Sequence, residues 1–210
     1  MIAKSIKGKS TSAIQLALEQ SMTDGFKPTL AICFISKSMD RNAISNLLDA
    51  VGISVFGCTT NGEFIDEETD KESAAILLLD MKKEYFHIYF HEFSEPNYRE
   101  AAQEIAKKAK EKFAVPAFFI GLSHHETDGE EVLRGLEDIV GKEVNAFGGG
   151  AGDDYAFKET VVFANGKDSN KAIVCIAIDE TKITVEGITT CGWKAVGTEK
   201  IVTKSEGNHV

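Results

Sequence analysis

Residues 30–36 read Leu-Ala-Ile-Cys-Phe-Ile-Ser, and residues 117–123 repeat the pattern as Ala-Phe-Phe-Ile-Gly-Leu-Ser. Continuous apolar runs of this length are typical of strands that are covered on both faces. Each run is followed by a polar loop, a predicted helix, a second apolar run and a glycine-rich turn. The two turns are residues 57–63 (GCTTNGE) and residues 148–154 (GGGAGDD).

The match continues beyond the turns, where residues 73–80 and 172–179 are again apolar runs of similar pattern. The sequence therefore predicts an α+β (mixed α/β) fold. It consists of pseudo-duplicated β-α-β-β-β units that form mixed sheets flanked by helices. Asn165-Gly166 is a strong hairpin signal in the second unit.

Four helices are predicted from apolar spacing and from residues that cap helix ends. They span residues 11–22, a segment from Asp40 to Gly52, residues 97–113, and a segment from Asp128 to Gly141. Strands are predicted for residues 30–36, 53–58, 73–81, 85–93, 117–124, 144–148, 159–164, 172–179, 182–191 and 199–203. The acidic residues 66–70 are predicted to form a solvated loop.

The charge balance excludes two classes of partner. The 210 residues carry 33 acidic and 23 basic side chains, a net charge of −10. No positive field is present to bind nucleic acid or an anionic membrane. No signal peptide is expected from the N-terminal residues, and the sequence contains no apolar stretch of about 18 residues. Its four cysteines form no C-x-x-C pair, so a reduced, cytoplasmic setting is expected.

The glycine-rich turns fail the tests for phosphate binding. Gly152 is followed by Asp153 and Asp154 rather than by the Lys-Ser/Thr of a P-loop, and the turn leads to a strand instead of a helix. Two carboxylates would also repel a phosphate. The small residues permit close approach of the backbone either to a neighbouring strand or to a ligand.

Residues 57–63 resemble the G-C-[ST]-T-x-G-E turn of FIST N-terminal domains, the sensory family named for F-box and intracellular signal transduction proteins. Further matching motifs follow in the same order along the chain. They are residues 132–136, 149–154, 165–166, 191–197 and 202–208. The resemblance therefore covers nearly the whole chain from residue 30.

The resemblance implies a single sensory domain over residues 1–210. The family usually continues into a C-terminal FIST domain, which is expected to be absent or truncated here. It also implies a small ligand, with amino acids proposed for the family. No enzymatic activity is expected. A signalling partner such as a histidine kinase, a cyclase or a chemotaxis protein would receive the signal.

The two turns are the predicted ligand site. Backbone amides and the side chains of Thr59, Thr60 and Asn61 would supply neutral hydrogen bonds, and Glu63 with Asp153 or Asp154 would hold a cationic group. The full predicted set is Gly57, Cys58, Thr59, Thr60, Asn61, Gly62, Glu63, Gly149, Gly150, Ala151, Gly152, Asp153 and Asp154.

Two alternatives remain open from the sequence. One is a haem-binding gas sensor, since some family members are haem proteins, with His124 and His125 as weak candidates for metal or haem contact. The other is an enzyme that uses Cys58 as a nucleophile or the carboxylates of Glu63 and Asp153. Neither a resident cofactor nor a metal is expected, and no catalytic residue is assigned.

Overall fold

A computed structural model describes residues 1–66, 68–123, 127–188 and 192–206. The helices of this described part are α1 (Thr11–Ser21), α2 (Arg41–Asp49), α3 (Tyr98–Lys112) and α4 (Gly129–Val140). The strands are β1 (Ala3–Gly8), β2 (Leu30–Ile35), β3 (Ser54–Thr59), β4 (Glu63–Ile65), β5 (Glu68–Asp70), β6 (Ala74–Leu79), β7 (Phe86–Glu92), β8 (Pro116–Leu122), β9 (Ala146–Gly150), β10 (Val162–Ala164), β11 (Lys167–Ser169) and β12 (Ala172–Asp179).

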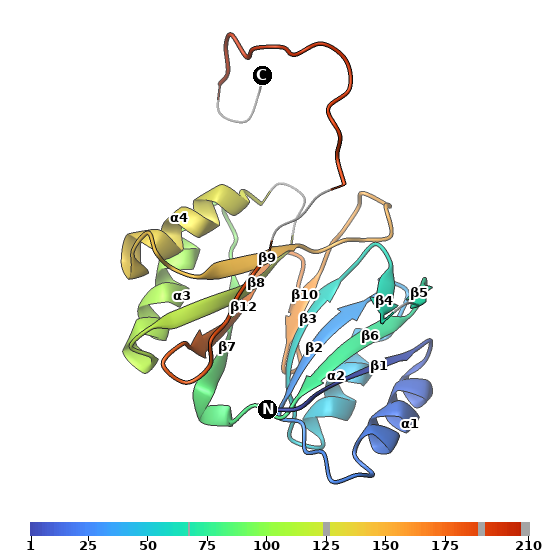
Figure 1. The fold of residues 1–210 in the computed structure, drawn as a ribbon. Coiled ribbons are helices and arrows are strands. Elements are labelled where there is room, and N and C mark those ends of the chain that lie inside the picture. Colours follow the sequence, from blue (N-terminus) through green and yellow to red (C-terminus); the bar gives the residue numbers. More distant parts are fainter. Residues whose placement is uncertain (67, 124–126, 189–191, 207–210) are drawn as a thin grey trace.

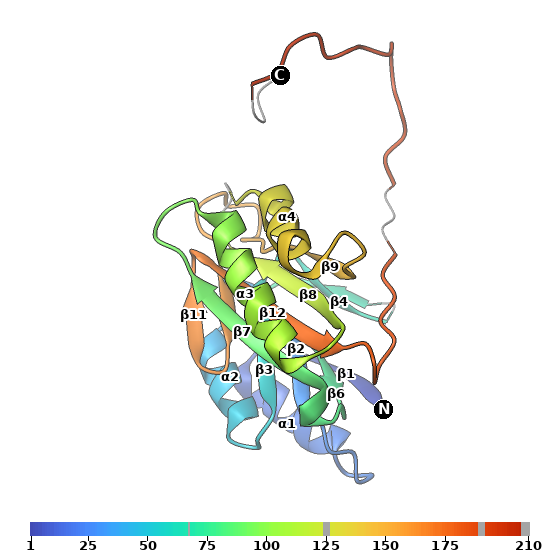
Figure 2. The same ribbon diagram turned by 90° about the vertical axis from the view of Figure 1, so that its left-hand side faces the viewer.

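Within the described residues, most strands belong to two sheets that pack face to face. The first sheet has the order β1-β6-β2-β3-β10-β11 and the second has the order β7-β12-β8-β9, while β4 and β5 form a separate hairpin. Helices α1 and α2 cover the outer face of the first sheet, and α3 and α4 cover that of the second (Figures 1 and 2). The result is a four-layer arrangement of helices, sheet, sheet and helices.

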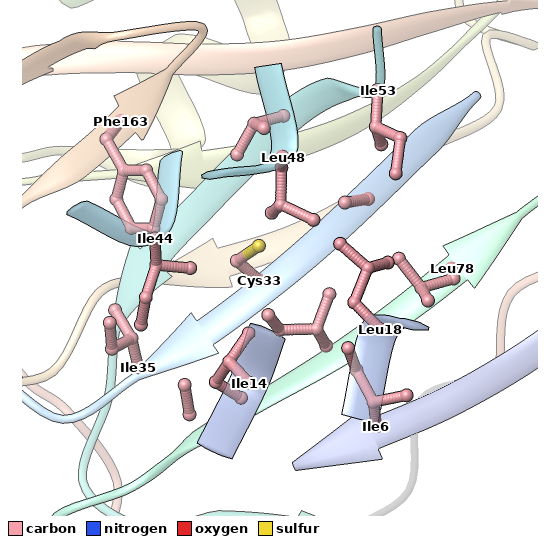
Figure 3. Close-up of a cluster of buried hydrophobic side chains, with 14 of the residues drawn as sticks. Ile6, Ile14, Leu18, Cys33, Ile35, Ile44, Leu48, Ile53, Leu78 and Phe163 are labelled. Atoms are coloured by element: carbon pink, nitrogen blue, oxygen red, sulfur yellow. The ribbon is translucent and has the colours of Figure 1, made fainter. Parts of the chain in front are cut away.

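Alternation along each strand divides its side chains between two cores, because successive residues point to opposite faces. On β2, Cys33 and Ile35 face the helices, where they pack with Ile14 and Leu18 of α1 (Figure 3). Leu30 on the same strand faces the second sheet. An apolar layer of both sheets fills the space between them, which explains why β2, β3, β6, β8 and β12 read as nearly continuous apolar runs.

The two halves of the chain repeat one topology. Strand order β1-β6-β2-β3 in the first sheet corresponds to β7-β12-β8-β9 in the second, and α1 and α2 correspond to α3 and α4. The predicted α+β fold with mixed sheets is therefore confirmed. The repeated unit begins one strand and one helix earlier than the sequence pattern indicated. The missed strand, β1, lies at a sheet edge and carries Lys4 and Lys7, so its apolar signal is weak.

Local signals placed the helix ends correctly. The side chain of Asp40 accepts a hydrogen bond from the Ala43 N–H at 2.9 Å, and Asp128 accepts hydrogen bonds from the first turn of α4. Asn165 and Gly166 have φ angles of 47° and 80° and form the predicted turn, although β11, the strand that follows it, was not predicted. In the described part of the chain, no helix has the length and apolar character that crossing a membrane requires.

Three local predictions were wrong. Residues 182–188 and 199–203 are not strands, and residues 189–191 lie outside the described part of the chain. The acidic segment predicted as a loop contains β5, which pairs with β4. Lys7 of β1 and Lys9, which follows β1, form ion pairs with Asp70 of this hairpin. These pairs join segments that are distant in sequence, so the local sequence pattern does not indicate them.

The two sheets are in close contact at Gly121 of β8. A Cβ atom at this position would lie 2.4 Å from Cys58 Sγ and 2.9 Å from Val174 Cγ1. These distances are shorter than van der Waals contact, so the inner layer has no room for a side chain there. The strand pair thus requires glycine at residue 121.

We expect Gly121→Ala to lower the free energy of unfolding by about 1–3 kcal/mol, because the added methyl group overpacks the inner layer. Adding Cys58→Ala to this variant should recover part of the loss, so that the double variant is more stable than additivity predicts. Urea unfolding followed by circular dichroism measures both effects. Strictly additive losses would contradict the direct contact.

Candidate functional site

The two glycine-rich turns meet at the ends of β3 and β9. The Gly152 N–H donates to the Thr59 carbonyl at 2.7 Å. The side-chain oxygen of Asn61 accepts hydrogen bonds from the backbone N–H groups of Asp153 (3.0 Å) and Tyr155 (3.1 Å). The repeat therefore brings together two segments that are about ninety residues apart in sequence, with 61 and 153 as one contacting pair.

A cavity of about 1010 Å³ lies beside this junction and extends around the outer edge of β9. Both sheets, the start of α4 and the segment after β12 contribute to its wall. The lining residues are Phe34, Phe56, Cys58, Thr59, Thr60, Phe119, Ile120, Leu122, Thr127, Gly129, Val132, Leu133, Asn145, Ala146, Phe147, Gly148, Gly149, Gly150, Ala151, Glu186, Gly187 and Ile188.

The cavity exists because the two repeats differ at this point. Residues 56–58 of β3 (Phe-Gly-Cys) correspond to residues 147–149 of β9 (Phe-Gly-Gly), since each triplet follows the same path beside its central strand. Glycine replaces Cys58 at residue 149, and a Cβ atom there would meet nothing within 4 Å. In addition, β10 covers the outer edge of β3, whereas β9 is an edge strand among the described strands.

The free edge of β9 directs peptide groups towards the cavity. The Asn145 carbonyl and the Ala151 N–H hydrogen-bond to β8, at 2.8 and 2.7 Å. Since successive residues of a strand direct their hydrogen-bonding groups to opposite sides, Ala146, Gly148 and Gly150 direct theirs away from β8. The glycines leave these groups accessible because they carry no side chains.

Aromatic rings form the apolar floor. The ring centroids of Phe56 and Phe119 are 5.0 Å apart, and those of Phe119 and Phe147 are 5.2 Å apart, so the three rings make a continuous row. Phe34 of β2 completes the wall and is 37% exposed. Such a row favours a ligand with an apolar or aromatic part.

Glu186 is the one charged side chain among the described lining residues. It belongs to the segment after β12, which Asn145 holds in place by donating from Nδ2 to the Val185 carbonyl (2.5 Å) and to Glu180 Oε1 (3.0 Å). Gly187 lies beside the Phe147 ring. The segment therefore forms part of the cavity wall and contacts the start of β9.

The structure divides the predicted site residues into two groups. Those that line the cavity are Cys58, Thr59, Thr60, Gly149, Gly150 and Ala151. Those outside the lining are Gly57, Asn61, Gly62, Glu63, Gly152, Asp153 and Asp154. Sequence reasoning did not select the four phenylalanines, because within apolar strands they have the same pattern as core residues. Their only signal is the repeat, which places Phe56 and Phe147 at equivalent positions.

The first carboxylate of the prediction holds a turn and does not face the cavity. Glu63 is buried, and it accepts hydrogen bonds from Thr60 Oγ1 at 2.6 Å and from Ser73 Oγ at 2.9 Å. The Thr60 hydroxyl hydrogen is thereby directed to Glu63, not to a ligand. Thr59 Oγ1 is similarly engaged with the backbone of Val161.

The carboxylates of the second turn also have structural partners. Asp153 is buried and accepts hydrogen bonds from the N–H groups of Phe157 (3.0 Å), Lys158 (2.7 Å) and Glu159 (3.1 Å). Asp154 accepts one from Ser36 Oγ at 2.8 Å. Both carboxylates therefore fasten the turn, and their contact with a cationic ligand stays a prediction.

The Cys58 thiol is unsuited to nucleophilic chemistry. Burial raises its pKa to about 12, so the reactive thiolate is scarce at neutral pH. His124 and His125 lie outside the described residues. Among the residues that are described, no cluster of three or more His, Cys, Asp or Glu side chains could hold a metal ion.

Comparison with known families gives one match. A family model described as FIST N domain matches residues 29–210. This range includes both turns, β9 and every residue of the cavity wall. No curated protein matches the chain.

Native protein is expected to react slowly with iodoacetamide at Cys33, Cys58 and Cys175 because burial raises the pKa of each thiol. Between pH 7 and 10 the rate at Cys58 should stay low, since its thiolate forms in quantity only as the pH approaches about 12. Peptide mass spectrometry measures each site, and urea-unfolded protein is the control. Rapid labelling of native Cys58 at pH 7 would restore the nucleophile hypothesis.

Asp153→Ala is expected to lower the free energy of unfolding by about 1–3 kcal/mol, because it removes the acceptor of several backbone N–H groups. Asp153→Asn retains one acceptor oxygen and should lose less. Urea unfolding compares the two variants with the parent chain. Unchanged stability in Asp153→Ala would show that the carboxylate is not needed for the turn and would return it to the list of candidate ligand groups.

Proposed function

Because the chain belongs to the FIST N domain family, a family of sensory and signal-transduction domains, we propose that the cavity beside β9 binds a small molecule and that its occupancy is signalled to a partner protein. The observation that carries this proposal is the difference between the repeats. At β3 the equivalent space is filled by β10 and by the Cys58 side chain. At β9 it remains as a cavity of about 1010 Å³, a size suited to a small ligand.

Amino acids fit the chemistry of the lining as a ligand class. Peptide N–H groups at Gly148 and Gly150 would donate to the carboxylate, while Glu186 would attract the ammonium group. The side chain would then contact the row of phenylalanine rings. In this arrangement the carboxylates of Glu63 and Asp153 support the site from outside.

The segment after β12 links the cavity to the rest of the chain. Residues 186–188 line the cavity, and residues 192–206 lead away from the packed body (Figure 1). Trp193 and Val196 in this stretch are 91% and 94% exposed, which suits contact with another protein surface. We place residues 1–210 as one cytoplasmic sensory domain whose partner is a signalling protein such as a histidine kinase, a cyclase or a chemotaxis protein.

Ligand binding is testable by thermal shift with a panel of amino acids and related metabolites. A true ligand should raise the Tm in a concentration-dependent manner. Gly149→Leu should weaken the apparent affinity, read from the concentration dependence of the Tm shift, by tenfold or more, since the new side chain enters the cavity. Gly192→Leu is the matched control, because Gly192 also has open space around it and lies outside the cavity.

Two results would contradict the proposal. The first is a folded protein whose Tm shifts with no member of the panel. The second is a shift that Gly149→Leu and Gly192→Leu affect equally, since binding would then occur elsewhere.

A further inference from the structure

The first repeat shows how a strand edge of this kind is occupied. β10 lies antiparallel to β3, with Val162 opposite Cys58, Phe163 opposite Gly57 and Ala164 opposite Phe56. The missing side chain at residue 57 is necessary, because a Cβ atom there would lie 2.1 Å from the ring of Phe163.

The hydrogen-bonding groups at this occupied edge alternate. The Thr59 N–H donates to the Val161 carbonyl at 2.9 Å, so Gly57 and the Thr59 N–H face the β10 side, while the Thr59 carbonyl accepts from the Gly152 N–H. The adjacent Val55 N–H also points outwards and donates to Asn165 Oδ1 at 2.7 Å. Residues 55, 57 and 59 thus form one row of outward donors and acceptors.

The edge of β9 repeats that row. Ala146, Gly148 and Gly150 correspond to residues 55, 57 and 59, and they direct their peptide groups to the cavity. Residues 186–188 also line this cavity. Adjacent strands are about 4.8 Å apart, and the cavity follows the edge where a further strand would run.

We propose that the ligand of this cavity is an extended peptide that binds antiparallel to β9 as an added strand of the second sheet. This inference rests on the proposed function, since it names the ligand class of the same site. Strand addition of this type derives affinity from main-chain hydrogen bonds and specificity from side-chain pockets.

The spacing of the edge groups favours a peptide over a free amino acid. Residues 146 and 150 are separated by about 13 Å along an extended strand, at roughly 3.3 Å per residue. A single amino acid pairs with one position of the row. A chain of five residues reaches all three positions.

Side-chain pockets follow from the equivalence with β10. The peptide residues opposite Phe147 and Gly149 would face the phenylalanine floor, as Ala164 and Val162 face the inner layer beside β3. The residue between them would face α4, where Leu133 lines the cavity and is 43% exposed. The preferred peptide thus carries apolar side chains at three successive positions.

The test uses a fluorescent, capped peptide with the sequence of residues 160–165, Thr-Val-Val-Phe-Ala-Asn, extended by two lysines for solubility. Binding to the whole chain is followed by fluorescence anisotropy. N-methylation of the phenylalanine amide, which faces the strand, should weaken binding by tenfold or more. N-methylation of the alanine amide, which faces away, should change it by less than about twofold.

A second experiment uses a pool of capped hexapeptides, so that the result does not depend on one peptide sequence. The peptides that the immobilised chain retains are identified by mass spectrometry. Gly149→Leu should abolish retention of the pool, and Gly192→Leu should leave it intact. Equal effects of the two methylations would overturn strand addition. If no peptide is retained while free amino acids still shift the Tm in a Gly149-dependent manner, the peptide inference fails and the proposed function stands; if neither class binds, both fail.

Discussion

The packing of the two sheets against each other is the constraint on which the rest of the structure depends. Their inner faces share one apolar layer, and at Gly121 the layer is so thin that Cys58 occupies the place of a side chain. Burying this layer supplies a large part of the folding free energy, because apolar area removed from water stabilises by roughly 25 cal/mol per Å². The turns after β3 and β9 meet only because the sheets are held this closely.

The repeat then turns a packing arrangement into a site. Residue 149 is the repeat equivalent of Cys58, and Phe34 is the repeat equivalent of Gly121. If the two repeats were identical, a side chain at residue 149 would pack over residue 34 as Cys58 packs over Gly121. A cysteine at residue 149 would fill the space as Cys58 does. Glycine leaves it open, and Phe34 at the other side is partly exposed as a result. One missing side chain and one missing edge strand are sufficient to explain the cavity.

The sequence predicted the α+β class, the four helices and the duplicated strand order. These features depend on local periodicity, caps and self-similarity, which a single chain displays directly. The direction in which each side chain of the turns points could not be predicted from these local patterns. Glu63 and Asp153 were expected to face a ligand, but their oxygens accept hydrogen bonds from residues 73 and 157–159, and no local pattern specifies those partners.

Strand predictions failed for segments whose structure depends on whether a neighbouring strand is available for pairing. β1 is polar along one face and becomes a strand because β6 provides hydrogen bonds along its whole length, from Ala3 opposite Leu79 to Gly8 opposite Ala74. Residues 182–188 alternate like a strand yet have no continuous partner. Alternation shows that a segment suits a sheet, whereas membership of a sheet also requires a free edge in register.

The composition of β9 is costly for stability, and this bears on its role. Glycine within a strand loses more conformational entropy on folding than alanine, by roughly 0.5–1 kcal/mol per residue, and three glycines occupy residues 148–150. An uncovered edge strand is also a liability, because its unpaired peptide groups can bind other chains. At β3 the protein avoids both costs with Cys58, Thr59 and β10. At β9 it retains both, and there, within the part of the chain that the structure describes, a cavity, a free edge and an aromatic floor coincide. A binding site needs this combination and a purely structural strand does not.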